Sequence, residues 1–206
     1  MGNQNTITRF GLIRHATTLW NQAKRIQGQN DTPLTPGGEN EAREWGRLLE
    51  PYKWDRILSS DIGRALTTAA IINGFLQVPM ISDPRLREQD WGNWTGKTFA
   101  QIKKETPHLL AEQVAAEWGF CPPGGEDRNS VWERSRKAIQ DTAQHWPGKN
   151  ILIVAHEGVI KCLVYRLYEY QLYLGEFAPI RPCHLHWLIH DQKELRIEKT
   201  NALSLN

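Results

Sequence analysis

Short apolar runs alternate along most of the chain with segments whose apolar residues recur at helical spacing. The runs predict strands at residues 10–13, 56–60, 78–82 and 151–155, and the last of these runs is apolar throughout. A strand without polar positions is typical of a parallel sheet that is covered on both faces. The pattern therefore places residues 151–155 at the centre of a sheet.

Helices are predicted between these strands and after the last one. Thr35 as N-cap, followed by Pro36, predicts a helix that runs to about Pro51. Asp61 is predicted to cap a second helix that reaches about Leu76. The remaining helical patterns cover residues 98–118 (interrupted at Pro107), 126–145 and 159–168.

The end of the chain returns to strands. Residues 184–190 and 194–199, joined by a short polar turn, predict an antiparallel hairpin. Alternating strands and helices closed by such a hairpin predict an α/β fold, a three-layer α/β/α sandwich around a mostly parallel sheet with a C-terminal antiparallel hairpin. Because no linker or repeat divides the sequence, residues 1–206 are expected to form a single domain.

Composition and charge exclude several classes of function. The 206 residues carry a formal net charge of +2 without a Lys/Arg block, so neither nucleic acid nor a membrane surface is an expected partner. No apolar stretch approaches the ~20 residues of a membrane span, and no signal peptide opens the chain, which predicts a cytoplasmic protein. Three cysteines without metal-ligand spacing predict reduced thiols and no metal site. An exposed edge of the terminal hairpin would suit a homodimer.

Polar groups of related chemistry follow three of the predicted strands. Arg14 and His15 end the first strand, a second strand leads through two serines to Arg64, and His156 follows the central strand. The carboxyl ends of parallel strands form the edge of a sheet where ligands bind. Arginine suits phosphate, and histidine can act as base or nucleophile. We therefore expect an anion site with one of three acids, which spacing does not distinguish, as the proton donor: Glu88, Asp90 or Glu157.

Five motifs in order between residues 10 and 165 resemble those of the histidine phosphatase superfamily, in its phosphoglycerate mutase-like branch. Residues 14–21 are similar to its Arg-His-Gly-Glu-Thr-x-x-Asn signature, and residues 59–69 to its Ser-Ser-x-x-x-Arg-Ala-x-x-Thr-Ala block. The other similar segments are residues 25–38, 86–92 and 154–158. The resemblance implies a phosphoglycerate mutase-like fold and a phosphatase for a small phosphorylated substrate, with no cofactor.

The resemblance also implies a role for individual residues. His15 is implied as the nucleophile that accepts the phosphoryl group, and Glu88 as the general acid. The phosphate-binding residues that it implies are Arg14, Asn21, Gln27, Gly28, Arg64 and His156. Three residues depart from the family pattern, because Ala16, Thr17 and Glu157 stand where the family usually has Gly, Glu and Gly. These departures affect fine geometry and substrate choice but remove no group that the reaction requires.

The implied chemistry makes further predictions about these groups. His15 must attack through an unprotonated nitrogen, so its other ring nitrogen should donate to a backbone carbonyl. Arg14, Arg64 and a protonated His156 would hold the phosphoryl oxygens, so no metal ion is needed. A bound phosphate should raise the pKa of Glu88, which predicts a rate that falls from acidic to neutral pH.

Two alternatives remain beside hydrolysis. A mutase would need a lid that excludes water, and residues 96–125 contain no obvious extended lid, which favours the phosphatase. A phospho-ligand binding module without catalysis is less favoured, because His15 and Glu88 are both present. The substrate stays open, although residues 91–125 should form the specificity wall. The aromatic residues of that wall are interpreted as packing: Trp94, Trp118 and Phe120.

Overall fold

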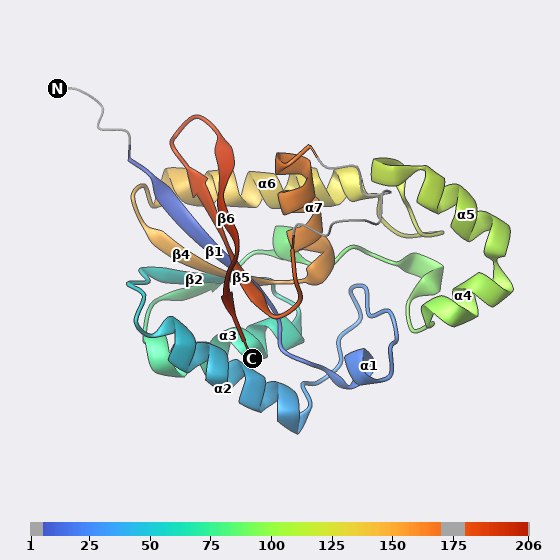
Figure 1. The fold of residues 1–206 in the computed structure, drawn as a ribbon, viewed down its shortest axis with the longest axis horizontal. Coiled ribbons are helices and arrows are strands. Elements are labelled where there is room, and N and C mark those ends of the chain that lie inside the picture. Colours follow the sequence, from blue (N-terminus) through green and yellow to red (C-terminus); the bar gives the residue numbers. More distant parts are fainter. Residues whose placement is uncertain (1–5, 170–179, 206) are drawn as a thin grey trace.

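The computed structural model describes residues 6–169 and 180–205, which form a six-stranded sheet between two layers of helices (Figure 1). The strand order is β3-β2-β4-β1-β5-β6. The first four strands in this order pair in parallel, whereas β5 is antiparallel to both β1 and β6. The predicted α/β fold with a C-terminal antiparallel hairpin is confirmed. The strands are β1 (Thr8–Arg14), β2 (Arg56–Ser59), β3 (Met80–Ser82), β4 (Asn150–Ala155), β5 (His184–His190) and β6 (Leu195–Ser204).

The helices cover both faces of this sheet. α2 and α3 lie on one face, and α6 and α7 lie on the other (Figure 1). The short α4 and α5 lie to one side, beyond the carboxyl ends of the parallel strands (Figure 1). The helices are α1 (Leu19–Gln22), α2 (Pro36–Leu49), α3 (Gly63–Leu76), α4 (Phe99–Glu105), α5 (Pro107–Ala115), α6 (Arg128–His145) and α7 (Glu157–Leu167).

Strand β4 lies between β1 and β2, and its side chains alternate between two apolar cores. Ile151, Ile153 and Ala155 pack with residues of α6 and α7. Leu152 and Val154 pack with residues of α2 and α3. Successive residues of a strand point to opposite faces, and both faces are covered here, so residues 151–155 are all fully buried. This is the physical reason for the unbroken apolar run.

The start of α3 differs from the prediction. Asp61 is not its cap, because the N-cap position is Ile62, which makes no side-chain capping bond. The Asp61 carboxylate instead forms an ion pair with Arg87, at 2.6 Å between Oδ2 and Nη2. The backbone N–H of Arg64 donates to Asp31 Oδ1 at 3.0 Å, from a loop more than thirty residues away. A tertiary contact thus takes the place of the local cap.

The segment between β3 and α6 folds as short elements around a small apolar cluster. Trp94, Ile102 and Phe120 form this cluster and are almost fully buried. Trp118 is partly buried and packs against the main core. The interpretation of these aromatic residues as packing is therefore confirmed. Pro107 is the first residue of α5, where a proline is tolerated, so it separates two helices instead of bending one.

The edges of the sheet are β3 and β6. β6 extends to Ser204, five residues beyond the predicted end of the hairpin at residue 199. An edge strand of this length offers unpaired backbone groups, but the homodimer stays a prediction. Within the described ranges, no helix is long and apolar enough to cross a membrane.

Candidate active site

The carboxyl ends of β1 and β4 open into a cavity of about 300 Å³. Arg14 and His15 reach it from the end of β1, and Arg64 from the first turn of α3. His156 follows β4, and its ring centroid lies 5.2 Å from that of His15. The structure thus brings together the four residues that were expected at one edge of the sheet. The predicted site residues that line the cavity are Arg14, His15, Asn21, Gln27, Gly28, Arg64 and Glu88.

His15 is buried, and a single orientation of its ring is fixed by hydrogen bonds. Its Nδ1 lies 2.8 Å from the carbonyl oxygen of Ala16, to which only an N–H can donate. Its Nε2 accepts a hydrogen bond from Arg64 Nε at 3.2 Å. The predicted bond from the ring to a backbone carbonyl is confirmed. Burial, together with Arg14 and Arg64, holds the pKa of His15 well below its usual value, so the ring is neutral and Nε2 carries the lone pair.

Arg64 is only 1% exposed, and the loop that carries Gly28 holds its guanidinium in place. Nη2 donates to the carbonyl oxygen of Gly28 at 2.7 Å, and Nη1 to that of Asn30 at 2.6 Å. Gly28 has a φ of +52°, a backbone conformation that favours glycine. Gly28, predicted to bind phosphate, therefore has a visible structural task, which is to position Arg64.

Asn21 and Gln27 also use their side-chain oxygens within the loops. Asn21 Oδ1 accepts from the backbone N–H of Thr18 and completes a capping box at the start of α1. Gln27 Oε1 accepts from the hydroxyl groups of Thr18 and Thr32. Among the described residues, neither amide nitrogen has a hydrogen-bond partner. Both side chains thus shape the rim of the cavity and keep donors available to a ligand.

Arg14 and Glu157 form an ion pair at the cavity wall. Arg14 Nη1 lies 2.6 Å from Glu157 Oε2, and Lys161 Nζ lies 2.5 Å from the other carboxylate oxygen. The Nε of Arg14 is buried and has no partner in the described part of the chain. Buried donors are rarely left without an acceptor. This orphaned donor indicates that the site is built for an anion.

His156 presents a second orphaned nitrogen. Its Nε2 lies 2.8 Å from Ser60 Oγ, whereas its buried Nδ1 has no partner within residues 6–169 and 180–205. Burial, His15 and Arg64 hold its pKa well below the usual value. The ring is therefore neutral near pH 7 when no ligand is bound, and a protonated His156 beside a phosphoryl group stays a prediction. Ser60 has no predicted role of its own, although it lies at the end of a predicted strand at this edge of the sheet.

The structure distinguishes the three candidate acids. Asp90 does not line the cavity, and its side chain accepts from the backbone N–H of Gly92. Burial opposes the ionisation of Glu157, but Arg14 and Lys161 outweigh it and lower its pKa. Burial raises the pKa of Glu88, which is the environment that a proton donor needs.

Two backbone amides hold the Glu88 carboxyl group in place. The N–H of Gln89 donates to Oε1 at 2.8 Å, and the N–H of Gly158 donates to Oε2 at 3.2 Å. A Cβ atom at position 158 would lie 2.2 Å from Glu88 Oε1. The glycine therefore lets the amino end of α7 approach the acid closely.

Trp91 and Phe99 line the cavity and belong to the predicted specificity wall, residues 91–125. Four further cavity residues have no predicted site role, and they are Arg25, Arg128, Lys161 and Cys162. Arg25 lies in a segment that matches the family, whereas no motif or strand end marks the other three. In the described part of the chain, no group of three or more His, Cys, Asp and Glu side chains is placed to hold a metal ion.

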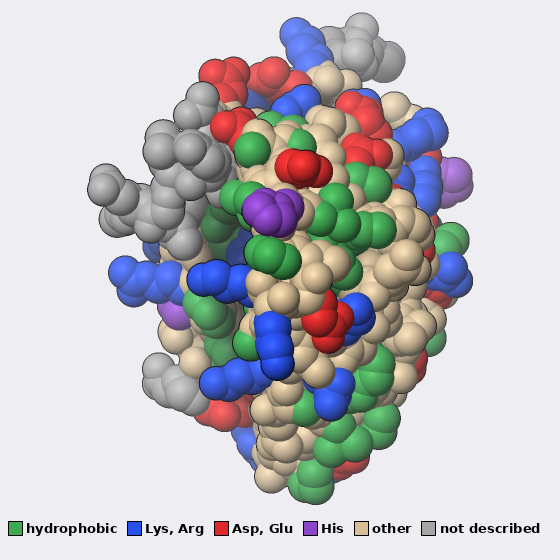
Figure 2. Space-filling view, turned by 90° about the vertical axis from the view of Figure 1, so that its right-hand side faces the viewer, with side chains coloured by type: hydrophobic (Ala, Val, Ile, Leu, Met, Phe, Trp, Pro, Cys, Tyr) green, Lys and Arg blue, Asp and Glu red, His purple; other side chains and the backbone are tan. Residues whose placement is uncertain are grey.

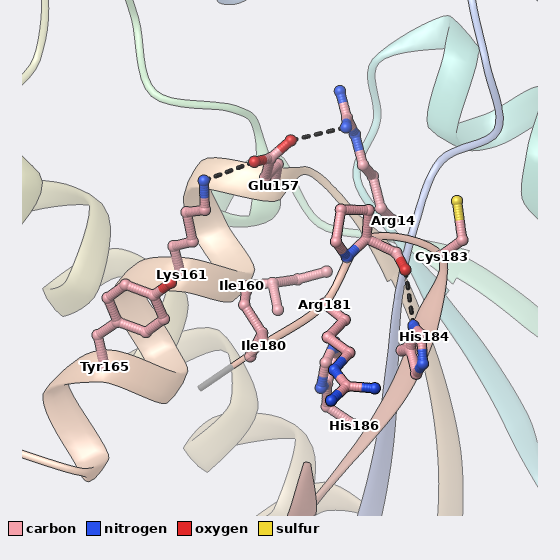
Figure 3. Close-up of a pocket in the computed structure, with 11 residues that line it drawn as sticks. Arg14, Glu157, Ile160, Lys161, Tyr165, Ile180, Arg181, Cys183, His184 and His186 are labelled. Carbon is pink, nitrogen blue, oxygen red and sulfur yellow. Dashed lines mark hydrogen bonds and ion pairs between the residues drawn. The ribbon is translucent and has the colours of Figure 1, made fainter. Parts of the chain in front are cut away.

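A second cavity of about 220 Å³ lies beside the first and shares part of its wall. Arg14, Glu157 and Lys161 line both cavities, and Figure 3 shows the Glu157 carboxylate between the two cations. Ile160 and Ile180 contribute apolar surface to this second cavity. Glu157, which stands where the family usually has Gly, thus lies in the wall between the two cavities.

The chain is similar in sequence to a known family and to individual proteins. The family model described as "Histidine phosphatase superfamily (branch 1)" matches residues 10–203. The chain is 31% identical over 181 residues to the probable phosphoglycerate mutase GpmB of Serratia proteamaculans, covering 88% of this chain and 84% of the relative. It is 32% identical over 158 residues to the uncharacterized phosphatase PhoE of Bacillus subtilis, covering 77% of this chain and 76% of the relative.

Solved structures show the same architecture. Bacillus stearothermophilus YhfR superposes with a TM-score of 0.86 at 31% identity, over 96% of this chain and 98% of that one. A mycobacterial glucosyl-3-phosphoglycerate phosphatase in complex with VO3 has a TM-score of 0.82 at 28% identity, over 95% of this chain and 99% of that one.

Proposed function

The chain belongs to branch 1 of the histidine phosphatase superfamily, and on that premise we propose that it hydrolyses a small phosphate monoester through a phosphohistidine at His15. The supporting observation is the ring of His15, whose Nδ1 is engaged by a carbonyl oxygen while Nε2 faces Arg64 in a cavity. A neutral imidazole with its lone pair toward a guanidinium can meet a phosphorus atom whose oxygens the cations hold.

The first step forms a bond between His15 Nε2 and phosphorus as the ester oxygen departs. Arg14 and Arg64 bind the phosphoryl oxygens, and the orphaned Nδ1 of His156 supplies a further donor. The negative charge of a phosphate raises the pKa of a neighbouring histidine, so substrate binding favours the proton on His156. Glu88 gives its proton to the leaving alkoxide.

The second step returns the enzyme to its starting state. Glu88, now ionised, takes a proton from a water molecule, whose oxygen attacks phosphorus as the bond to His15 breaks. The products are inorganic phosphate and a free, neutral imidazole. Because arginine side chains supply the positive charge, we expect turnover to persist in the presence of a chelator such as EDTA.

The test is chemical trapping of the intermediate. A 32P-labelled ester is mixed with the protein, the reaction is stopped with alkali, and the labelled residue is located by mass spectrometry. We expect an acid-labile, alkali-stable phosphoryl group on His15 and no label on a His15→Ala variant. Hydrolysis at full speed by that variant would refute the proposal.

Phosphoryl transfer between hydroxyl groups is the second candidate, because one relative is named a probable phosphoglycerate mutase. The two activities differ in their products. Incubation with 3-phosphoglycerate would release inorganic phosphate from a phosphatase, whereas a mutase would yield the 2-phospho isomer without net loss of the ester. We expect phosphate release.

A further inference from the structure

The catalytic cavity contains more positive charge than one phosphoryl group requires. Beside Arg14 and Arg64, three further cations line it: Arg25, Arg128 and Lys161. Lys161 is paired with Glu157. In the described part of the chain, neither Arg25 nor Arg128 has a carboxylate oxygen within 4 Å. Lys and Arg side chains also gather on one side of the outer face that Figure 2 shows, at the end of the molecule where α4 and α5 lie.

Arg128 is held in place without a counter-ion. Its guanidinium lies 4.2 Å from the ring centroid of Phe120, and Nη1 donates to the carbonyl oxygen of Glu117 at 2.9 Å. Nε and Nη2 have no partner among the described residues. Burial lowers the pKa of Arg128, which means that its charge is poorly solvated. A partly buried charge without a partner is costly unless a ligand supplies the opposite charge.

The position of Arg128 on its helix adds to this cost. It is the first residue of α6, where the helix dipole favours anions and disfavours a cation. The helix is capped by Asp127, whose carboxylate accepts from Ser130 and not from Arg128. The contacts with Phe120 and Glu117 hold the guanidinium in place, but neither they nor the helix cap neutralises its charge.

Neighbouring groups show on which side of the cavity Arg128 lies. Arg128 lies over the ring of Phe120, and the carbonyl oxygen of Phe120 accepts a hydrogen bond from Gln89 Nε2 at 3.4 Å. Gln89 follows Glu88 in the chain, and both line the same cavity as Arg128. Arg128 thus lies on the side of the cavity where Glu88 and Gln89 stand, which is the side that the leaving group of an ester would occupy.

We propose that Arg128 is the anion-binding residue of a leaving-group subsite, so that the preferred substrates are phosphate esters whose alcohol carries a second anionic group. The second group would be a carboxylate or another phosphate, both of which a guanidinium binds through two parallel hydrogen bonds. The inference rests on the proposed function, in which Glu88 gives its proton to the leaving group and so marks where that group lies.

Matched pairs of esters test this preference. 3-Phosphoglycerate and glycerol 3-phosphate differ only in a carboxylate against a hydroxymethyl group. Propane-1,3-diol bisphosphate and 3-hydroxypropyl phosphate test a second phosphate in the same way. We expect the anionic member of at least one pair to have a kcat/KM that is about 10- to 100-fold higher, as one charge-assisted contact provides. The pair that shows the preference identifies the anionic group.

Variants assign the preference to Arg128. Arg128→Gln removes the charge, and Arg128→Met also keeps an apolar stem over Phe120. In both we expect the ratio of kcat/KM values within the pair to fall to near one. The ratio decides, because a general loss of activity changes both members of a pair equally. Lys137→Gln removes a cation from the exposed side of the same helix and should keep the ratio. Equal rates within both pairs in the unaltered protein, or a ratio that survives in Arg128→Gln, would overturn the inference.

A binding measurement separates this inference from the proposed function. Calorimetry with His15→Asn gives the affinity of the same esters without turnover. Tighter binding of the anionic ester, lost in the double variant with Arg128→Gln, supports the subsite even if the unaltered protein hydrolyses neither ester. Equal binding within both pairs overturns the subsite and leaves the phosphohistidine untouched.

Discussion

At the scale of single residues, the site depends on groups whose protonation is set by their surroundings. His15 and Glu88 are ordinary side chains with opposite shifts, since burial lowers the pKa of the imidazole and raises the pKa of the carboxyl group. Near neutral pH these shifts favour an unprotonated His15 in the same cavity as a Glu88 that can still carry its proton. Burying ionisable side chains costs free energy, so solubility alone does not explain where these two residues lie.

Glu88→Gln tests the acid directly. The protonated form of Glu88 decreases as pH rises through its pKa, so kcat should fall on the alkaline side, at a higher pH than an ordinary carboxyl group would give. The variant has no proton to transfer, and we expect kcat for an alkyl ester to fall by about 10²- to 10⁴-fold with loss of that limb. The measurement is the pH profile of kcat for both proteins. An unchanged alkaline limb in Glu88→Gln would assign it to another group.

Gly158→Ala tests how the acid is positioned. The new methyl group would lie 2.2 Å from Glu88 Oε1, so the carboxyl group must move. We expect a loss of about 10²-fold in kcat for alkyl esters and a much smaller loss for p-nitrophenyl phosphate, whose leaving group needs no proton. Gly74→Ala in α3 is the matched control, because nothing lies within 4 Å of its added Cβ. Equal losses for both esters would show that Gly158 does not act through Glu88.

At the scale of elements, the site is assembled from strand ends and from loops that reach across the sheet edge. β1 and β4 deliver Arg14, His15 and His156 because parallel neighbours end on the same side. The loop of residues 28–31 then fixes Arg64 through two carbonyl oxygens and one carboxylate. The strand ends thus bring the site residues close together, and the loop orients the Arg64 guanidinium among them.

Asp31 is the residue of this loop that joins it to α3. Asp31→Ala leaves the N–H of Arg64 without its acceptor, and we expect the free energy of unfolding to fall by about 1 kcal/mol, as for the loss of an N-cap. Asp61→Ala removes only the exposed ion pair with Arg87 and should have a smaller effect. Denaturant unfolding of the two variants measures both values. A larger loss of unfolding free energy in Asp61→Ala than in Asp31→Ala would show that Asp61 stabilises the start of α3, as the sequence predicts.

At the scale of the whole molecule, buried histidines couple stability to pH. His186 in β5 is 2% exposed, and burial, with His184 nearby, lowers its pKa to about 4. The folded state therefore binds fewer protons than the unfolded state between pH 4 and 6.5. Stability contributed by the neutral ring is complete above this window and is lost as pH falls through it. Burial also lowers the pKa values of His15 and His156.

His186→Gln isolates one of these contributions. We expect the unaltered protein to unfold in one cooperative transition and to lose stability as the pH falls from 6.5 to 4. A pKa difference of this size corresponds to at most about 3 kcal/mol. The variant should lose less stability than the unaltered protein between these two pH values, as measured by urea unfolding at each pH. Parallel curves for the two proteins would show that His186 has no part in the acid sensitivity.

The sequence by itself determined the sheet, its central strand and the sheet edge at which the candidate site lies. An apolar run covered on both faces has one stable place in an α/β fold, and Arg14, His15 and His156 follow strands that must end on one edge. These features depend on local pattern, so the chain reveals them without its fold. The bond from His15 to a backbone carbonyl also involves an adjacent residue, Ala16.

Only the tertiary structure decided which of the three candidate acids is buried with a raised pKa, which residue bonds to the first turn of α3 and which additional cations line the cavity. Each depends on a contact between segments that are distant in sequence: Gly158 with Glu88, Asp31 with Arg64, and Arg128 with the catalytic cavity. Spacing along the chain contains no information about such contacts, because the loops between the elements can take many paths. Burial and pKa follow from the path actually taken, and the chemistry of the site follows from them.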